Sequence, residues 1–363
     1  MLDRMSRRLA AAAAVAAVCL AAAAGAQAAT VETVASGLDN PRGVSIGPDG
    51  AVYVANAGRG GPKCSGKGEQ RQCLGDTGRV VRVVNGDVST LAGGFFSGSA
   101  PGGLFAGPLT GVSVAPDGQV FAVTGSATPR EVKALPKRVR KQVGRLYNVT
   151  DGKRSVVARI DRVEWKRNLD NVKGDRNSNP YAVLALADRQ VVADAGANAV
   201  LEVRGGKVDV LAVIPKNRRG SQPVPTSLAV DPATGDIIVG ELAFGGGKGR
   251  ARVWRIPAAG GKPTLFATGF TAITGLAFGP DGSLYVTEFD RKPRTEEPEG
   301  RVVRLAPDGS RTNLGDGELF APTGAAVDAS GALYVSNFSV LPRKTPKKSP
   351  FKGAGGTLVK ITP

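Results

Sequence analysis

The sequence contains no histidine, and this absence limits the chemistry that it can perform. Catalysis by Ser-His-Asp or Cys-His groups, zinc held by histidine and haem ligated by histidine are all excluded. Cysteine is also scarce, with three residues in 363. An enzyme built on this chain would therefore depend on carboxylates, tyrosine, lysine or a hard metal ion with bound water.

Long apolar runs are missing beyond the N-terminus. Residues 1–28 combine Arg4, Arg7 and Arg8 with an Ala/Val/Leu run, and they end in Ala26-Gln27-Ala28. This pattern is typical of a secretory signal that is cleaved after Ala28, and its apolar run is too short for a stable membrane span. We expect a signal peptide over 1–28 and a single domain over 29–363, secreted as a soluble monomer with no membrane span.

Two cysteines remain after this cleavage, Cys64 and Cys73, and both lie in the insertion 59–77. In an oxidising compartment such a pair is expected to form a disulfide that closes a small loop. A metal site at the same place would need two further ligands, which the insertion does not supply in a recognisable pattern.

Acidic residues are fewer than basic ones, at 31 against 48, which gives a formal net charge of +17. The leader carries three Arg and one Asp, so the processed chain would carry +15. In an exported protein this positive field favours an anionic ligand, a wall polymer or an acidic protein partner. Nucleic acid is disfavoured, because the basic runs lack interleaved aromatic residues and no DNA-binding motif is present.

One sequence pattern, which predicts an apolar strand, a tight turn and a second apolar strand, occurs six times. Its first copy runs from Asn40 to Asn56, and its turns are centred near Gly50, Gly118, Arg189, Gly235, Gly282 and Gly331. Five copies are followed by two further strands, as in 79–84 with 88–92 and 145–149 with 155–159. Four antiparallel strands that repeat about every 40 to 50 residues are typical of β-propeller blades.

The sixth copy reaches only its third strand, at 357–361, before the sequence ends at Pro363. Residues 31–35 precede the first copy and match the fourth strands in type. We therefore predict an all-β fold, a six-bladed β-propeller of four-stranded blades, closed by pairing this N-terminal strand into the last blade.

The two faces of such a ring are predicted to differ. Links between strands one and two and between strands three and four are tight turns, which leave one plain face. All long insertions fall on the other connections, and we call that side the elaborated face. They are 59–77, 93–107, 125–144, 160–179, 244–250, 289–300 and 338–356.

Two of these insertions are strongly basic. From Pro129 to Arg145 there are seven Lys/Arg against one Glu, and from Asn337 to Lys352 there are five against no acid. Thr128-Pro129-Arg130-Glu131 is a capping-box pattern that predicts a short helix, with a second helical piece over 137–143 after Pro136. The basic runs either serve solubility alone or contact an anion or a wall polymer.

The last residue of strand two is polar in every copy. Residues at one offset of a repeat occupy equivalent positions around the axis, so we expect six oxygen-bearing side chains to converge at the channel rim. They are Asn56, Thr124, Asp194, Glu241, Glu288 and Asn337. Asp194, Glu241 and Glu288 would suit Ca²⁺. Alternatively the rim organises channel water, with Arg42 relieving the repulsion between carboxylates.

Several motifs resemble the ScyD/ScyE family of secreted proteins. They include Val34-Ala35-Ser36-Gly37-Leu38-Asp39-Asn40-Pro41-Arg42-Gly43, Ser178-Asn179-Pro180-Tyr181-Ala182 and Val192-Ala193-Asp194-Ala195-Gly196-Ala197-Asn198. The resemblance covers nearly all of the chain after the leader. It implies a six-bladed propeller similar to NHL and gluconolactonase-type proteins, and it carries no agreed catalytic residues.

Two functions remain open at this point. The first is a non-catalytic binding protein that holds a ligand or partner on the elaborated face, favoured because no catalytic dyad stands out. The second is a metal-dependent hydrolase of lactonase type, in which Asp194, Glu241 and Glu288 act as metal ligands or base.

Overall fold

The computed structural model describes residues 29–362, apart from 69–70, 217–220, 244–245 and 293–297. The expected signal peptide 1–28 and the first two residues of the insertion 244–250 lie outside the described residues. Within the described ranges, no helix has the length and apolar character that a membrane crossing requires.

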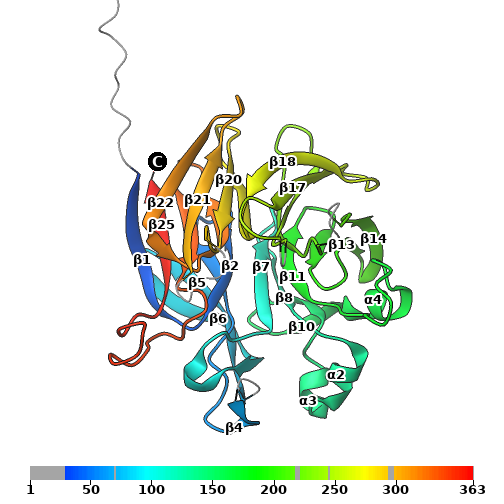
Figure 1. Cartoon of the computed structure of the whole chain (residues 1–363), viewed down its shortest axis with the longest axis vertical. Coiled ribbons are helices and arrows are strands. Elements are labelled where there is room, and N and C mark those ends of the chain that lie inside the picture. The colour runs from blue at the N-terminus through cyan, green and yellow to red at the C-terminus, as the bar shows by residue number, and fades with distance from the viewer. Residues whose placement is uncertain (1–28, 69–70, 217–220, 244–245, 293–297, 363) are drawn as a thin grey trace, which may run out of the picture.

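Six antiparallel sheets surround a central axis as the blades of a propeller, which confirms the predicted fold (Figure 1). Blade one consists of β2 (Pro41–Ile46), β3 (Val52–Asn56), β5 (Gln72–Val84) and β6 (Asp87–Ser99). Blade two consists of β7 (Leu109–Val114), β8 (Val120–Thr124), β9 (Arg145–Asn148) and β10 (Ser155–Arg159). Blade three consists of β11 (Pro180–Ala185), β12 (Gln190–Asp194), β13 (Ala199–Arg204) and β14 (Lys207–Val213).

The remaining blades repeat the same order of strands. Blade four consists of β15 (Pro225–Val230), β16 (Ile237–Glu241), β17 (Ala251–Ile256) and β18 (Thr264–Phe270). Blade five consists of β19 (Ile273–Phe278), β20 (Leu284–Glu288), β21 (Glu299–Leu305) and β22 (Arg311–Phe320). Blade six consists of β23 (Thr323–Val327), β24 (Leu333–Asn337), β25 (Gly356–Thr362) and the N-terminal β1 (Thr30–Leu38).

The N-terminal strand closes the ring as predicted. Strand β1 pairs antiparallel with β25, in a register that runs from Thr30 opposite Thr362 to Leu38 opposite Gly356. Leu38 is fully buried, together with Leu358 of the partner strand. The outer strand of the last blade is therefore supplied by the opposite end of the chain.

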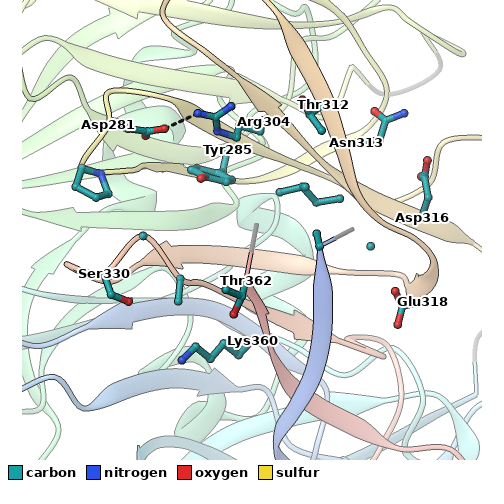
Figure 2. Close-up of a pocket in the computed structure, with 16 residues that line it drawn as sticks. Asp281, Tyr285, Arg304, Thr312, Asn313, Asp316, Glu318, Ser330, Lys360 and Thr362 are labelled. Atoms are coloured by element: carbon teal, nitrogen blue, oxygen red, sulfur yellow. Dashed lines mark hydrogen bonds and ion pairs between the residues drawn. The ribbon is translucent and has the colours of Figure 1, made fainter. Parts of the chain in front are cut away.

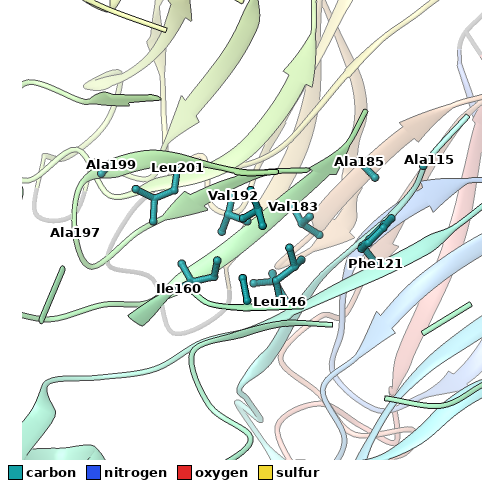
Figure 3. Packing of buried hydrophobic residues seen from close by; sticks show 13 residues of the cluster. Ala115, Phe121, Leu146, Ile160, Val183, Ala185, Val192, Ala197, Ala199 and Leu201 are labelled. Carbon is teal, nitrogen blue, oxygen red and sulfur yellow. The ribbon is translucent and has the colours of Figure 1, made fainter. Parts of the chain in front are cut away.

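Each contact between neighbouring blades holds its own apolar cluster. The cluster between blades two and three, for example, packs Phe121, Leu146 and Ile160 against Val192 and Leu201 (Figure 3). Equivalent clusters fill the other five contacts, including that between blades six and one. Because each sheet has apolar residues on both faces, no blade can be buried without its two neighbours.

The first strands form an inner ring in which threonines donate hydrogen bonds from blade to blade. The hydroxyl of Thr226 reaches the carbonyl of Ile273 at 2.6 Å, and that of Thr274 reaches the carbonyl of Pro322 at 2.9 Å. Thr110 and Thr323 make the same bond to Pro180 and Pro41. Each of these four threonines therefore joins the start of its blade to the start of the next.

Glycine follows the threonine in blades two, five and six, because the inner strands approach each other too closely for a side chain. At Gly324 the backbone φ is +29°, and a Cβ atom would lie 2.3 Å from the carbonyl oxygen of Arg42. A larger residue at this position would force neighbouring inner strands apart.

Two insertions on the elaborated face fold further than the sequence predicted. In blade one the third and fourth strands continue as a long hairpin to Gln72 and Ser99, and β4 (Cys64–Ser65) pairs onto it. The predicted disulfide between Cys64 and Cys73 joins β4 to β5. The short 3-10 helix η2 (Pro101–Gly103) follows this hairpin.

The helical insertion of blade two also matches its prediction. Helix α2 (Pro129–Ala134) begins with the expected capping box between Thr128 and Glu131, and α3 (Lys137–Arg140) follows Pro136. A third helix, α4 (Asp161–Arg167), occupies the next insertion, where no helix was predicted. In Figure 1 the three helices gather on one side of the ring.

We predict that deletion of residues 30–36 from the chain lacking 1–28 opens the ring. Strand β25 would then present an unpaired edge, and such edges promote aggregation. The deletion should lower the melting temperature and produce high-molecular-weight species in size-exclusion chromatography. The chain that lacks only residues 1–28 is the control and should remain folded, and an equally stable deletion variant would contradict this account of closure.

Candidate functional site

The six predicted rim residues all lie at the ends of second strands and are buried. None is more than 3% exposed. Four of them accept a backbone hydrogen bond from the segment that precedes strand one of the same blade. The backbone N–H donates to the side-chain oxygen at 2.5 to 2.8 Å in each pair, and the pairs are Asp39 with Asn56, Asn179 with Asp194, Thr271 with Glu288 and Phe320 with Asn337. In these four blades the shared offset therefore reflects a shared bond within the blade.

The acidic members are also paired inside their own blades. Glu241 accepts from Arg252 at 2.6 Å and from the indole nitrogen of Trp254 at 2.9 Å. Glu288 accepts from Arg301 at 2.5 Å. Asp194 accepts from the hydroxyl of Ser178 and from the backbone N–H groups of Asn179, Gly196 and Ala197.

Thr124 and Arg42 are likewise held by local partners. The hydroxyl of Thr124 donates to the carbonyl of Gln142 at 2.7 Å and accepts from the N–H of Arg145 at 3.2 Å. Arg42 donates to the carbonyl of Ala106 at 3.0 Å, and the ion pairs found among the described residues do not include it. Arg42 therefore does not pair with the rim carboxylates, although the sequence had suggested that it would relieve the repulsion between them.

A calcium ion does not fit these residues. Within the described ranges, no three His, Cys, Asp or Glu side chains lie close enough together to hold a metal ion. The carboxylates of Glu241 and Glu288 are occupied by arginines, which would have to be displaced before a cation could bind. The expected convergence of Asp194, Glu241 and Glu288 on one ion is not seen.

The channel itself is lined by first strands, which explains why the rim residues do not meet. Its lining comes from the same three positions of five blades, such as Thr110, Gly111 and Val112, and from Gly43 and Val44 of blade one, and its volume is about 50 Å³. That space holds one or two water molecules. Strand two lies one layer further from the axis, so its last side chain bonds within the blade.

A larger and strongly basic pocket of about 390 Å³ lies beside the helices of blade two. We call it the basic pocket. It is formed by α2, α3, the ends of β9 and β10 and the first turns of α4. Its lining residues are Pro129, Val132, Lys133, Lys137, Arg140, Lys141, Arg145, Arg159 and Trp165. Six of these nine side chains are cationic, and none is acidic.

The floor of the basic pocket is built from a buried ion pair. Asp161 is fully buried and accepts from Arg145 at 3.0 Å, and Arg159 lies 3.5 Å away. Burial raises the pKa of Asp161 and lowers that of Arg159, although their mutual attraction opposes both shifts. The Nε atom of Arg159 is buried without a hydrogen-bond partner. The floor therefore offers a donor that lacks an acceptor.

The rim of the basic pocket carries exposed and unneutralised charge. Lys133, Lys137, Arg140 and Lys141 make no ion pair with any residue that the structure describes. Apolar contacts of Val132 and Val139 with Phe96 hold the two helices against the long hairpin of blade one. The helices are therefore anchored, while their cationic side chains remain free to meet a ligand.

Sequence reasoning found part of this pocket. The basic run 129–145 marked its helices, and the four lysine and arginine residues of the rim belong to that run. Arg159 and Trp165 were missed, because they belong to another strand and to the unpredicted α4. The available signal for that helix was the pattern Asp161-Arg162-Val163-Glu164-Trp165, which has acids in its first turn and an apolar residue between them.

A second cavity of about 730 Å³ lies between blades five and six on the plain face (Figure 2). Its charged side chains carry both signs, and Asp281 and Arg304 are paired at 2.5 Å on the side of blade five. Asp316, Glu318 and Lys360 also line it. Because its charges are mixed and partly paired, this cavity favours no single class of charged ligand.

Two buried carboxyl groups, Glu164 in α4 and Asp194 at the end of β12, have raised pKa values. Burial raises the pKa of Glu164 to about 7, and repulsion by Asp170, Asp194 and Asp175 adds to this shift while the N–H of Leu169 opposes it. Burial also raises the pKa of Asp194 to about 6, against the hydrogen bonds that it accepts. Both groups therefore take up protons more readily in the folded chain than in the unfolded one.

We predict that the free energy of unfolding falls as the pH rises from about 4.5 through about 7. A carboxyl whose pKa is raised by folding contributes stability at low pH, and this contribution is lost as the folded group ionises. For Glu164 the effect is on the order of 1 to 3 kcal/mol. Urea unfolding at pH 5 and pH 8 measures it.

The variant Glu164→Gln should flatten this part of the pH profile and raise the stability at pH 8. Glu32→Gln, at an exposed position of β1, controls for the loss of one carboxyl group. If Glu164→Gln kept the full pH dependence of the unmodified chain, the assignment to Glu164 would be wrong.

Comparison with known proteins supports the fold and leaves the family open. No protein-family model and no curated protein matches the sequence. Several solved structures resemble this one, including a gluconolactonase from Xanthomonas campestris, with 12% identity, a TM-score of 0.54 and coverage of 92% of this chain and 89% of that chain. A protein of unknown function from Bacteroides thetaiotaomicron has 11% identity, a TM-score of 0.57 and coverage of 92% and 76%.

The calcium-binding protein regucalcin from Agrobacterium tumefaciens has 14% identity, a TM-score of 0.50 and coverage of 90% and 92%. At such low identity these similarities show the six-bladed fold alone. The resemblance to the ScyD/ScyE family remains a prediction from the motifs.

Proposed function

We propose that this chain is an exported, non-catalytic β-propeller that binds an anionic ligand in the basic pocket on its elaborated face. The observation that carries the proposal is the lining of that pocket, with six cationic side chains and no carboxylate in about 390 Å³. Arg145 and Arg159 are paired with Asp161, but the four rim cations form no ion pair with a described residue, and this unbalanced charge favours an external anion.

The chemistry of the pocket favours an acidic polymer. Guanidinium groups such as Arg140 bind phosphate and carboxylate oxygens through paired hydrogen bonds, and the exposed lysines add attraction without fixed geometry. The half-buried indole of Trp165 offers an apolar surface beside them. A wall polymer whose sugar units carry phosphate or carboxylate groups would use both features.

The disulfide between Cys64 and Cys73 supports the extracytoplasmic part of the proposal. Disulfides persist in oxidising compartments and are rare in reducing ones. The leader pattern over residues 1–28 is in accord with it. A processed chain with a net charge of +15 would be attracted to an anionic wall as a whole, and the basic pocket would give that attraction a specific place.

We predict that reversing two rim charges, Lys137→Glu with Arg140→Glu, lowers the affinity for polygalacturonate or polyphosphate by at least about tenfold. Both side chains are exposed and neither forms an ion pair with a described residue, so the fold should not change. Fluorescence anisotropy with labelled polymer at 0.05 and 0.15 M salt measures the affinity and its salt dependence.

The matched control is Lys153→Glu with Lys262→Glu, which changes the net charge equally but lies on turns of the plain face. Neutral dextran serves as the control polymer. If both double variants lost affinity to the same extent, binding would depend on net charge alone and the basic pocket would not be the site.

The alternative function is a metal-dependent hydrolase of lactonase type that uses Asp194, Glu241 and Glu288. Its support is the fold shared with a gluconolactonase, and the separate pairing of Glu241 and Glu288 with arginines counts against it. The measurement that separates the two functions is hydrolysis of gluconolactone with added Ca²⁺ and with chelator. We expect no turnover above the uncatalysed rate in either condition, and chelator-sensitive turnover that Glu288→Gln abolishes would favour the hydrolase.

A further inference from the structure

Four blades place an arginine beside the end of their second strand, at the start of the pairing with strand three. The four equivalent residues are Arg79, Arg145, Arg252 and Arg301. Three of them pair with a carboxylate that lies nearby in the sequence. Arg145 pairs with Asp161 at 3.0 Å, Arg252 with Glu241 at 2.6 Å and Arg301 with Glu288 at 2.5 Å.

Blade one breaks this pattern, because Asn56 stands opposite Arg79 where blades four and five have glutamate. An asparagine accepts through one atom only, and its Oδ1 already accepts from the N–H of Asp39 at 2.6 Å. In blade five one oxygen of Glu288 accepts the equivalent N–H of Thr271, and the other accepts from Arg301. The acceptor that would serve Arg79 is therefore missing.

Two donors at this place have no acceptor. The Nδ2 atom of Asn56 and the Nε atom of Arg79 are both buried and lack a hydrogen-bond partner. The side chain of Asn56 is fully buried. Unsatisfied buried donors are rare in folded proteins, so Arg79 is short of an acceptor at this place.

Asp39 does not replace the missing carboxylate. Both of its oxygens accept from Arg343, at 2.5 to 3.1 Å, and the backbone N–H of Arg343 also donates to it. Its Oδ2 atom lies 4.0 Å from Arg79 and 3.7 Å from Arg59. Burial raises the pKa of Asp39, but the hydrogen bonds from Arg343 outweigh it and the net shift is downward.

Three guanidinium groups therefore share one carboxylate. Burial lowers the pKa of Arg79, and repulsion by Arg343 and Arg59 lowers it further, while Asp39 opposes the shift. The side chains of Arg59, Arg79 and Arg343 are 47%, 26% and 44% exposed, so the group is open to solvent. It lies at the junction of blades one and six on the elaborated face, and none of its residues lines the basic pocket.

We propose that Arg79, together with Arg59 and Arg343, binds the carboxylate group of a ligand on the solvent-exposed side of these three guanidinium groups. The fold supplies the guanidinium of Arg79 in the same register as Arg252 and Arg301, but it leaves the anion to be provided from solution. Acidic sugars and other small carboxylates carry the required group. This site is independent of the proposed function, since the basic pocket could fail to bind while this site does not.

The direct test follows the side-chain Nε–H signals of arginine in ¹H–¹⁵N spectra of the chain without residues 1–28. Sodium acetate and sodium glucuronate, titrated against sodium chloride at constant ionic strength, should shift the Arg79 signal with saturation. The signal of Arg252, which is already paired with Glu241, is an internal control and should not move. Arg79→Gln assigns the signal by its loss, and the acetate affinity of this variant, read from the Nε–H signals of Arg59 and Arg343, should be lower by at least about tenfold.

Asn56→Glu tests the same idea by supplying the missing carboxylate from within the chain. The glutamate can accept from the N–H of Asp39 and from Arg79, as Glu288 does from Thr271 and Arg301. This variant should melt at a higher temperature than the unmodified chain, and its Arg79 signal should no longer respond to acetate. Arg59→Gln, at a more exposed position, should weaken acetate binding and leave the fold intact.

Several results would overturn the proposal. They are an Arg79 signal that acetate and glucuronate leave unmoved, a response to chloride or sulfate as large as that to acetate, and an unchanged acetate response in a folded Asn56→Glu variant. Acetate and glucuronate are compared to separate the bare carboxylate from the acidic sugar, and equal affinities would assign the binding to the carboxylate group alone.

Discussion

The close approach of the six inner strands is the constraint on which the rest of the structure depends. Threonine hydroxyls of four blades bond to the carbonyl at the start of the next blade, and glycines such as Gly324 let the backbones come together. This packing leaves about 50 Å³ along the axis. A ligand larger than a few waters has no room there, and the insertions around the ring, which form the basic pocket, offer space that the channel lacks.

The fold could be predicted from the sequence because the strand pattern of a blade is repeated six times. Each copy pairs a tight turn with two apolar strands, and repetition makes the blade count and the order of strands unambiguous. The last blade lacked one strand, and residues 31–35 matched the fourth strands in type, which predicted the pairing of β1 with β25. The capping box at Thr128 and Glu131 was a local signal of the same clarity.

The site was harder to predict. A shared offset in the repeat shows that residues occupy equivalent positions, but it does not show where their side chains point. Asn56, Thr124, Asp194, Glu241, Glu288 and Asn337 are equivalent as expected, yet their side chains bond within the blades and do not meet at the axis. Which layer of a blade faces the channel is decided by packing between strands. The basic run 129–145 marked the helices of the basic pocket, but the contact of Arg159 and Trp165 with that run left no pattern in the sequence.

The pairing of β1 with β25 also sets an order of events during biosynthesis. Strand β1 is made before blades one to five, whereas its partner, Gly356–Thr362, is made after them. The edge of β1 must therefore wait unpaired until those five blades have been made, and only then can the final blade assemble. Completion of the ring thus becomes a late, concerted step, and a chain that passes through a narrow translocation pore beforehand would still lack its last blade.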